Sequence, residues 1–266
     1  MPANILSVHL SILHPRLLST LILYEPVMMS SRNGEPNPAL MPTMRRDLWE
    51  SRAKAETSFR KAFKTFDPRV LERYLKYGLR EVPTVLYNPT VDTTIPASAV
   101  TLATSKHQEA WAYTQTNLEP REAGLDRLLL PDWDQTLDIP FLYTSAECRI
   151  TMENLPHLRP SVLYIFGAKS PLSPLSSQDE KMKLTGSGLG GSGGVVEGKV
   201  EKVTLMDLGH LLVFEDVKES ARVSAAWIDQ WFQQWLAQAQ NFWEGVRGMV
   251  IQLVWSYDYR NKHVLF

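Results

Sequence analysis

The sequence is poor in cysteine, in surplus charge and in long apolar runs, and each shortage removes a class of protein. Cys148 is the single cysteine in 266 residues, which excludes an internal disulfide and a thiolate metal cage and fits a reducing compartment. Lys and Arg total 28 against 29 Asp and Glu, a net charge of -1, so we expect no nucleic-acid partner. No stretch approaches the ~18 consecutive apolar residues that cross a bilayer, so we expect no membrane span. No secretory leader is recognisable, so we do not expect secretion by that route.

Patterns for metal and dinucleotide binding are also weak. His9, His14, His107 and His157 lack a metal-ligand spacing such as H-E-x-x-H. Residues 186–194 contain a formal G-x-G-x-x-G, but a dinucleotide fingerprint must follow a strand and open a helix, so that backbone amides meet the pyrophosphate. Here a polar segment precedes the glycines and a predicted strand follows them. We therefore predict a flexible surface loop, with no metal and no cofactor.

The chain does have enough apolar material, 44% of its residues, to form a sizeable core. Residues 20–24 and 162–167 are short apolar runs typical of buried parallel strands, and residues 200–206 predict a further strand. Residues 214–243 predict a long helix with an apolar face. Residues 3–13 fit either a buried helix or a strand, because periodicity does not separate the two. This alternation of strands and helices predicts an α/β fold with a parallel sheet.

The middle of the chain is predicted to be helical. Residues 30–46 are typical of a loop, and apolar residues then recur at helical spacing from 48 to 66. Asp67-Pro68 is an N-cap with proline in the first turn of a second helix, which Gly78 can end. Ser105 and Gln108 have capping-box spacing and predict a third helix through residue 117. Helices that interrupt a sheet in this way suggest a lid, whereas residues 249–255 resemble a strand in a tail, 244–266, that we do not place.

Two titratable residues follow predicted strands. Glu25 ends the strand at 20–24, and His210 follows the strand at 200–206. A carboxylate bonded to one ring nitrogen of a histidine fixes its tautomer and stabilises the imidazolium formed in acyl transfer. Glu25 and His210 are therefore candidates for the acid and base of a catalytic triad. The alternative is structural, because a strand-end histidine considered alone is more often structural than catalytic.

Several stretches in the same order resemble a fungal α/β-hydrolase family of secondary-metabolite clusters, which includes peroxisomal acyl-CoA hydrolases and hydrolase-like proteins of toxin pathways. The matching stretches are Ala3-Asn4-Ile5, His14-Pro15-Arg16-Leu17, Leu21-Ile22-Leu23-Tyr24-Glu25-Pro26, Asp67-Pro68-Arg69, Leu158-Arg159-Pro160-Ser161, residues 186–194 and Gly209-His210-Leu211. The glycine-rich run before the histidine strand is the most specific of them. The resemblance implies a partial α/β-hydrolase fold, with core segments 1–29 and 158–243 and a helical lid at 30–157.

The resemblance also implies a site. In the family, Gly-His-Ser-x-Gly precedes the stretch that resembles Ala3-Asn4-Ile5, which puts the nucleophilic serine immediately before Met1 and the Met1 backbone amide in the oxyanion hole. Glu25 occupies the place of the family's aspartate, and His210 that of its histidine. We therefore expect an N-terminally truncated chain that is inactive as written, because it lacks the attacking hydroxyl.

The expected function is hydrolysis of an acyl thioester or ester, a small-molecule substrate, in fungal secondary or toxin metabolism. The alternative is a non-catalytic, hydrolase-like binding or regulatory protein. The resemblance implies an intracellular, peroxisomal location, but residues 263–266 are not a peroxisomal address, which leaves the cytoplasm open. The sequence does not indicate an oligomeric state.

Overall fold

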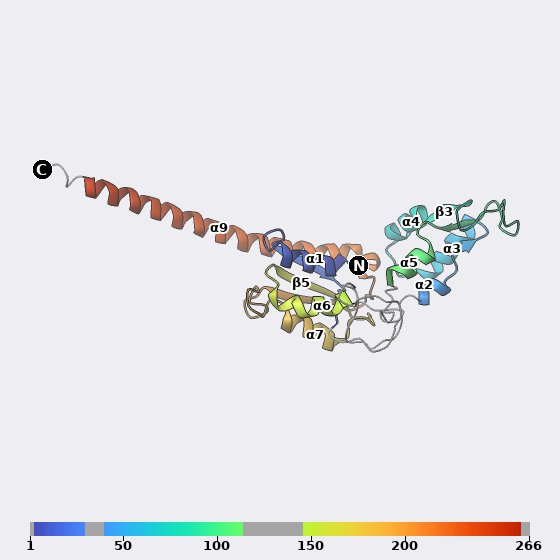
Figure 1. Cartoon of the computed structure of the whole chain (residues 1–266), viewed down its shortest axis with the longest axis horizontal. Helices are drawn as coiled ribbons and strands as arrows, with labels where there is room; N and C mark the ends of the chain where they lie inside the picture. The colour runs from blue at the N-terminus through green and yellow to red at the C-terminus, as the bar shows by residue number, and fades with distance from the viewer. Residues whose placement is uncertain (1–2, 30–39, 114–145, 262–266) are drawn as a thin grey trace, which may run out of the picture. The chain divides into compact units, whose positions relative to one another are not determined.

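The computed structural model describes residues 3–29, 40–113 and 146–261 (Figure 1). The chain divides into two compact units, Met1–Val217 and Lys218–Phe266. The first unit carries the candidate catalytic residues. The second consists of a long helix.

A three-stranded parallel sheet forms the core of the first unit. Its strands are β1 (Thr20–Tyr24), β5 (Ser161–Gly167) and β6 (Val200–Leu205), in the order β1-β5-β6. β5 is the central strand, with a neighbour on each side, and all seven of its residues are buried. These strands confirm the three predicted strands and the parallel α/β arrangement expected from the sequence.

Helices cover this sheet. They are α1 (Ala3–Leu13), α6 (Ala146–Asn154), the 3-10 turn η2 (Leu155–His157) and α7 (Leu175–Leu184). Residues 3–13, which periodicity left undecided, form a helix whose Ile5 and Val8 are fully buried. Residues three apart lie on one helix face, so both side chains enter the same core cluster as Tyr164 and Phe166 of β5.

Residues 40–113 form a second, smaller sheet with its own helices. The helices are α2 (Leu40–Met44), α3 (Arg52–Ala62), α4 (Pro68–Tyr77) and α5 (Lys106–Tyr113). The strands β2 (Leu48–Trp49), β3 (Leu79–Glu81) and β4 (Val100–Leu102) pair antiparallel in the order β2-β4-β3. The sequence analysis predicted a loop through residue 46, where α2 forms, and only helices from residue 48 onward. Strands of two and three residues are too short to show alternation, so the pattern did not reveal them.

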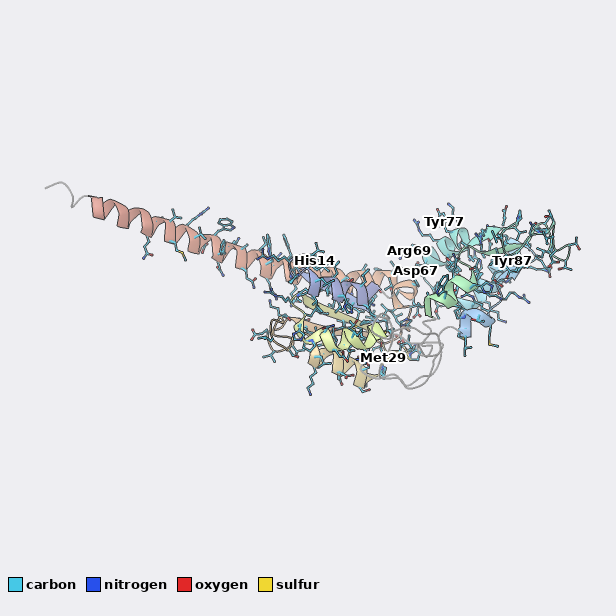
Figure 2. The ribbon with its side chains drawn as sticks, viewed as in Figure 1. His14, Met29, Asp67, Arg69, Tyr77 and Tyr87 are labelled. Atoms are coloured by element: carbon cyan, nitrogen blue, oxygen red, sulfur yellow. The ribbon has the colours of Figure 1, made fainter. Side chains whose placement is uncertain are left out.

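The predicted caps of this region are confirmed. The Asp67 carboxylate accepts a hydrogen bond from the amide of Arg69 at the start of α4, where Figure 2 labels both side chains, and Gly78 is the C-cap. The Ser105 amide donates to Gln108 Oε1, and the Gln108 amide donates to Ser105 Oγ, as a capping box requires. The predicted extension of α5 from residue 114 to 117 lies outside the described residues.

The glycine-rich segment 186–194 is a folded loop packed on η2, which differs from the flexible loop expected. The amide of Gly186 donates to the carbonyl of Leu155, and that of Gly188 to the carbonyl of Pro156. A Cβ on Gly191 would lie 2.4 Å from the Pro156 carbonyl oxygen. Glycine is needed here for close backbone approach, and these amides are already bonded within the protein.

After α8 (Leu212–Glu215), the chain forms α9 (Val217–Asn261), a single helix of 45 residues. The prediction of a strand at residues 249–255 is wrong, because this segment continues α9. A short apolar run cannot be assigned to strand or helix by periodicity alone, and here the helix propagates from the preceding turns. None of the described helices is long and apolar enough to cross a bilayer.

Candidate active site

Glu25 lies at the carboxyl end of β1 in an unusual backbone conformation. Its φ is +45°, the single positive value at a non-glycine residue within the described ranges. The Glu25 amide still donates to the carbonyl of Ile165, 2.9 Å away, and the side chain is 3% exposed. Strained backbone of this kind is concentrated at functional sites, because the surrounding structure must compensate its cost.

The Glu25 carboxylate is held by the loop that follows β5. The Gly167 amide donates to Oε1 at 2.6 Å, and the hydroxyls of Ser170 and Ser173 donate to Oε2 at 2.6 and 3.0 Å. Burial alone would raise the pKa of Glu25, but hydrogen bonds from His210, Ser170, Gly167 and Ser173 outweigh burial and hold this pKa below its usual value. Glu25 is therefore ionised at neutral pH.

His210 follows β6 and meets this carboxylate. Its Nδ1 lies 3.1 Å from Oε2 of Glu25, although 185 residues separate the two in the chain, and its side chain is 37% exposed. An ionised carboxylate only accepts hydrogen bonds, so Nδ1 carries the proton and Nε2 of the neutral imidazole is left as a base. Among the described residues, Nε2 has no hydrogen-bond partner.

Gly167 allows the loops after β5 and β6 to meet. A Cβ at this position would lie 2.4 Å from the carbonyl oxygen of Gly209 and 2.6 Å from that of Leu208. The amide of Lys169 donates to the Leu208 carbonyl, and the amide of Gly209 donates to Glu215 Oε2. Two hydrogen bonds thus anchor the backbone of Leu208 and Gly209, directly before His210.

The beginning of α1 lies at the same edge of the sheet. Asn4 Nδ2 donates to the carbonyl of Tyr24, 2.8 Å away, so the first turn of α1 contacts the residue before Glu25. The free amides of a helix N-terminus favour negative charge in their vicinity. Met1, which the resemblance places in an oxyanion hole, lies outside the described residues.

Sequence reasoning missed the serine ligands of Glu25. Ser170 and Ser173 follow β5, and the carboxyl ends of adjacent parallel strands meet at one sheet edge, which was a usable signal. Lys181 was also missed. It is fully buried, its Nζ donates to Ser177 Oγ at 2.6 Å, and burial lowers its pKa to about 8 against the attraction of nearby acids, including Glu25. In the described part of the chain, no group of three or more His, Cys, Asp or Glu could hold a metal ion.

Curated proteins similar in sequence to this chain include fungal hydrolases. The chain is 34% identical to the type I acyl-CoA thioesterase mpaH of Penicillium roqueforti, over 93% of this chain and 62% of that protein. It is 25% identical to the abhydrolase domain-containing protein ACTT2-1 of Alternaria alternata, over 83% of this chain and 78% of that protein. This chain is a homologue of fungal α/β-hydrolases. No protein-family profile matches it.

The fold of this α/β-hydrolase homologue agrees with that relationship. The peroxisomal α/β-hydrolase Lpx1 of Saccharomyces cerevisiae superposes with a TM-score of 0.58 at 13% identity, over 87% of this chain and 52% of the yeast chain. The chain also spans only 62% and 55% of the thioesterases from P. roqueforti and Penicillium brevicompactum. The predicted fold class, a partial α/β-hydrolase fold, is confirmed.

Proposed function

We propose that this chain supplies the acid and the base of a serine hydrolase that cleaves acyl thioesters or esters. The single observation that carries this proposal is the contact between His210 Nδ1 and Glu25 Oε2, 3.1 Å apart at the carboxyl edge of the parallel sheet. A buried, ionised carboxylate on one ring nitrogen leaves the other nitrogen as a general base. Acyl-CoA thioesters are the substrate class in this proposal, because the homologous Penicillium proteins are named as acyl-CoA thioesterases.

In the proposed mechanism, the nucleophile is the serine that the family resemblance places immediately before Met1. Nε2 of His210 takes the hydroxyl proton as the serine oxygen attacks the thioester carbon. The negative charge on the carbonyl oxygen is stabilised by backbone amides at the start of α1, where the resemblance places the amide of Met1. The imidazolium returns its proton to the leaving thiol, and water then releases the acid from the acyl-serine by the same steps. Glu25 stabilises the imidazolium throughout.

We further propose that the lid of this enzyme lies within the region 30–157, and that segments 1–29 and 158–243 belong to its catalytic core. The end of the region 30–157 is an exception, because Met152 of α6 and Leu155 of η2 pack in the core cluster of the parallel sheet. The amide of Asp67 donates to the carbonyl of Phe214, 2.8 Å away, and the rings of Phe66 and Phe214 lie 5.7 Å apart. Phe214 is four residues from His210, so the lid contacts the element that follows the base. The location proposed from the resemblance is the peroxisome, with the cytoplasm as the alternative.

The test is to join the chain behind an N-terminal segment that carries a Gly-His-Ser-x-Gly elbow, taken from a homologous thioesterase. This enzyme should release free thiol from a medium or long acyl-CoA, and His210→Ala should lower kcat by about 10³-fold or more. His107→Ala is the matched control, because His107 is an exposed histidine on α5. Unchanged turnover in His210→Ala would remove this residue from the mechanism. A well-folded fusion without hydrolysis would favour the alternative, a non-catalytic hydrolase-like binding protein.

A further inference from the structure

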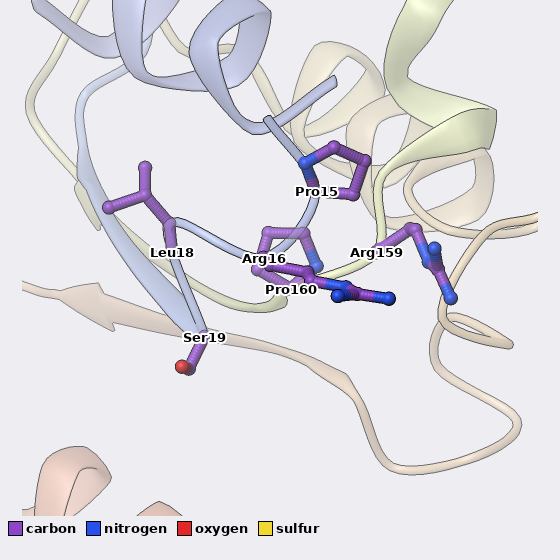
Figure 3. A pocket seen from close by; sticks show the side chains of 6 residues that line it. All are labelled: Pro15, Arg16, Leu18, Ser19, Arg159 and Pro160. Atoms are coloured by element: carbon purple, nitrogen blue, oxygen red, sulfur yellow. The ribbon is translucent and has the colours of Figure 1, made fainter. Parts of the chain in front are cut away.

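A pocket lies at the opposite edge of the parallel sheet from Glu25 and His210. It is lined by Pro15, Arg16, Leu18, Ser19, Arg159 and Pro160, and its volume is about 320 Å³ (Figure 3). These residues precede β1 and β5, so the pocket is at the amino ends of strands whose carboxyl ends carry the candidate catalytic pair. The seven residues of β5 separate the two places by roughly 20 Å, at about 3.3 Å per residue.

Two segments that are far apart in the chain form this pocket. Residues 15–19 follow α1, and residues 159–160 follow η2. Arg16 and Arg159 both belong to stretches that the sequence analysis singled out for their family resemblance. The proposed hydrolysis uses neither of them. Their arginines are therefore not explained by the candidate active site.

The charge in this pocket is unbalanced. Within the described residues, neither Arg16 nor Arg159 forms a hydrogen bond or ion pair through its guanidinium group. Five other arginines of the described ranges each pair with a carboxylate: Arg45, Arg60, Arg69, Arg149 and Arg222. Figure 3 shows the side chains of Arg16 and Arg159 on the same side of the pocket. Two like charges in one concavity repel each other, and an anion between them relieves that repulsion.

We propose that this pocket binds a small molecule through its phosphate group. A guanidinium group presents a planar fork of donors that matches phosphate oxygens, and two forks supply enough donors for a dianion. A volume of 320 Å³ is at the lower end of the ~300–1,000 Å³ typical of small-molecule sites, which leaves room for more than the phosphate. The rings of Pro15 and Pro160 and the side chain of Leu18 provide apolar walls for that remainder.

Calorimetric titration of the 266-residue chain with adenosine monophosphate, inorganic phosphate and adenosine tests this proposal. The two phosphate compounds should bind saturably and adenosine should not. Arg16→Gln with Arg159→Gln should weaken binding by at least about tenfold, since hydrogen bonds to charged groups are lost. Arg159→Lys keeps the charge and loses the fork, so it should give an intermediate weakening.

Arg73→Gln with Arg80→Gln is the matched control, because it removes two exposed charges outside the pocket and should change affinity less than twofold. Circular dichroism checks that every variant is folded. Tighter binding of the nucleotide than of inorganic phosphate identifies a nucleotide-like ligand, and equal binding identifies free phosphate; both support the phosphate site. The proposal is overturned if neither compound binds, if adenosine binds as well as its monophosphate, or if the control weakens binding as much as the pocket variant does.

Discussion

The Glu25→Gln substitution changes the candidate site with almost no change in shape. Glutamine keeps one acceptor oxygen for the Gly167 amide but puts an NH₂ group where Oε2 accepts from Ser170, Ser173 and His210. The hydroxyls must turn round to become acceptors, and His210 Nδ1 must give up its proton to accept as well. The imidazole then carries its proton on Nε2 and cannot act as a base.

The cost in stability can be worked out from these bonds. The Gly167 bond changes from charge-assisted to neutral, which loses about 1 kcal/mol, and a buried Ser173 hydroxyl without an acceptor costs about 1–3 kcal/mol. We therefore expect Glu25→Gln to reduce the free energy of unfolding by about 2–4 kcal/mol at pH 7. In the thioesterase fusion described above, the wrong tautomer should also lower kcat by about 10⁴-fold.

The difference in the free energy of unfolding between wild type and Glu25→Gln should change with pH in a defined direction. The pKa of Glu25 is lowered in the folded state from its usual 4.5, so its stabilising contribution is complete above pH 4.5 and is lost as the pH falls through the folded-state pKa. Urea unfolding of wild type and Glu25→Gln, followed by circular dichroism, should show a difference that is constant from pH 7 to 5 and shrinks below 4.5. Glu81→Gln, at an exposed carboxylate of β3, should stay within about 0.5 kcal/mol of wild type. A difference that grows towards low pH would refute the reasoning.

Two further predictions concern Gly167 and Tyr87. Gly167→Ala should lower the free energy of unfolding by about 1–3 kcal/mol and reduce turnover of the fusion, because the added Cβ meets the backbone beside His210. The control is Gly245→Ala, which lies in open space on α9 and should not destabilise the protein. An unchanged melting temperature for Gly167→Ala would contradict this account. Burial, the hydrogen bond to Asp47 and the negative charge of Asp47 raise the pKa of Tyr87 to about 12. The stabilising contribution of the protonated Tyr87 is therefore complete below pH 10 and is lost as the pH rises towards 12. Phenolate absorbance of wild type minus Tyr87→Phe should show one group that titrates near pH 12; titration near pH 10 would show that Tyr87 is solvated.

Local chemistry accounts for what could be predicted along the chain. The strand β5 needed no long-range information, because a strand buried on both faces is apolar throughout, and the apolar residues of β1 also marked it as a strand. The caps at Asp67 and Ser105 could be predicted for a similar reason, since each involves residues two or three positions apart. Both candidate catalytic residues were found because parallel strands end at one edge of a sheet.

The predictions that failed concern features that depend on contacts between residues far apart in the chain. The strands β2, β3 and β4 exist through pairing with each other between distant positions, such as Leu48 with Thr101, which two- and three-residue segments do not encode locally. The apolar segment at 249–255 has no strand partner within the described residues and continues α9 instead. The glycine-rich loop has its conformation because its amides reach the carbonyls of η2.

The sequence by itself determined the parallel α/β core, the helix caps, and a carboxylate and a histidine at strand ends, because each depends on apolar periodicity or on neighbours within one helical turn. Only the tertiary structure decided that Glu25 accepts from Gly167, Ser170 and Ser173, that it touches His210 across 185 residues, and that Arg16 and Arg159 share a pocket. The physical reason is that hydrogen bonds and charges act over a few ångströms. Which distant residues come that close depends on how the strands pair and the loops pack.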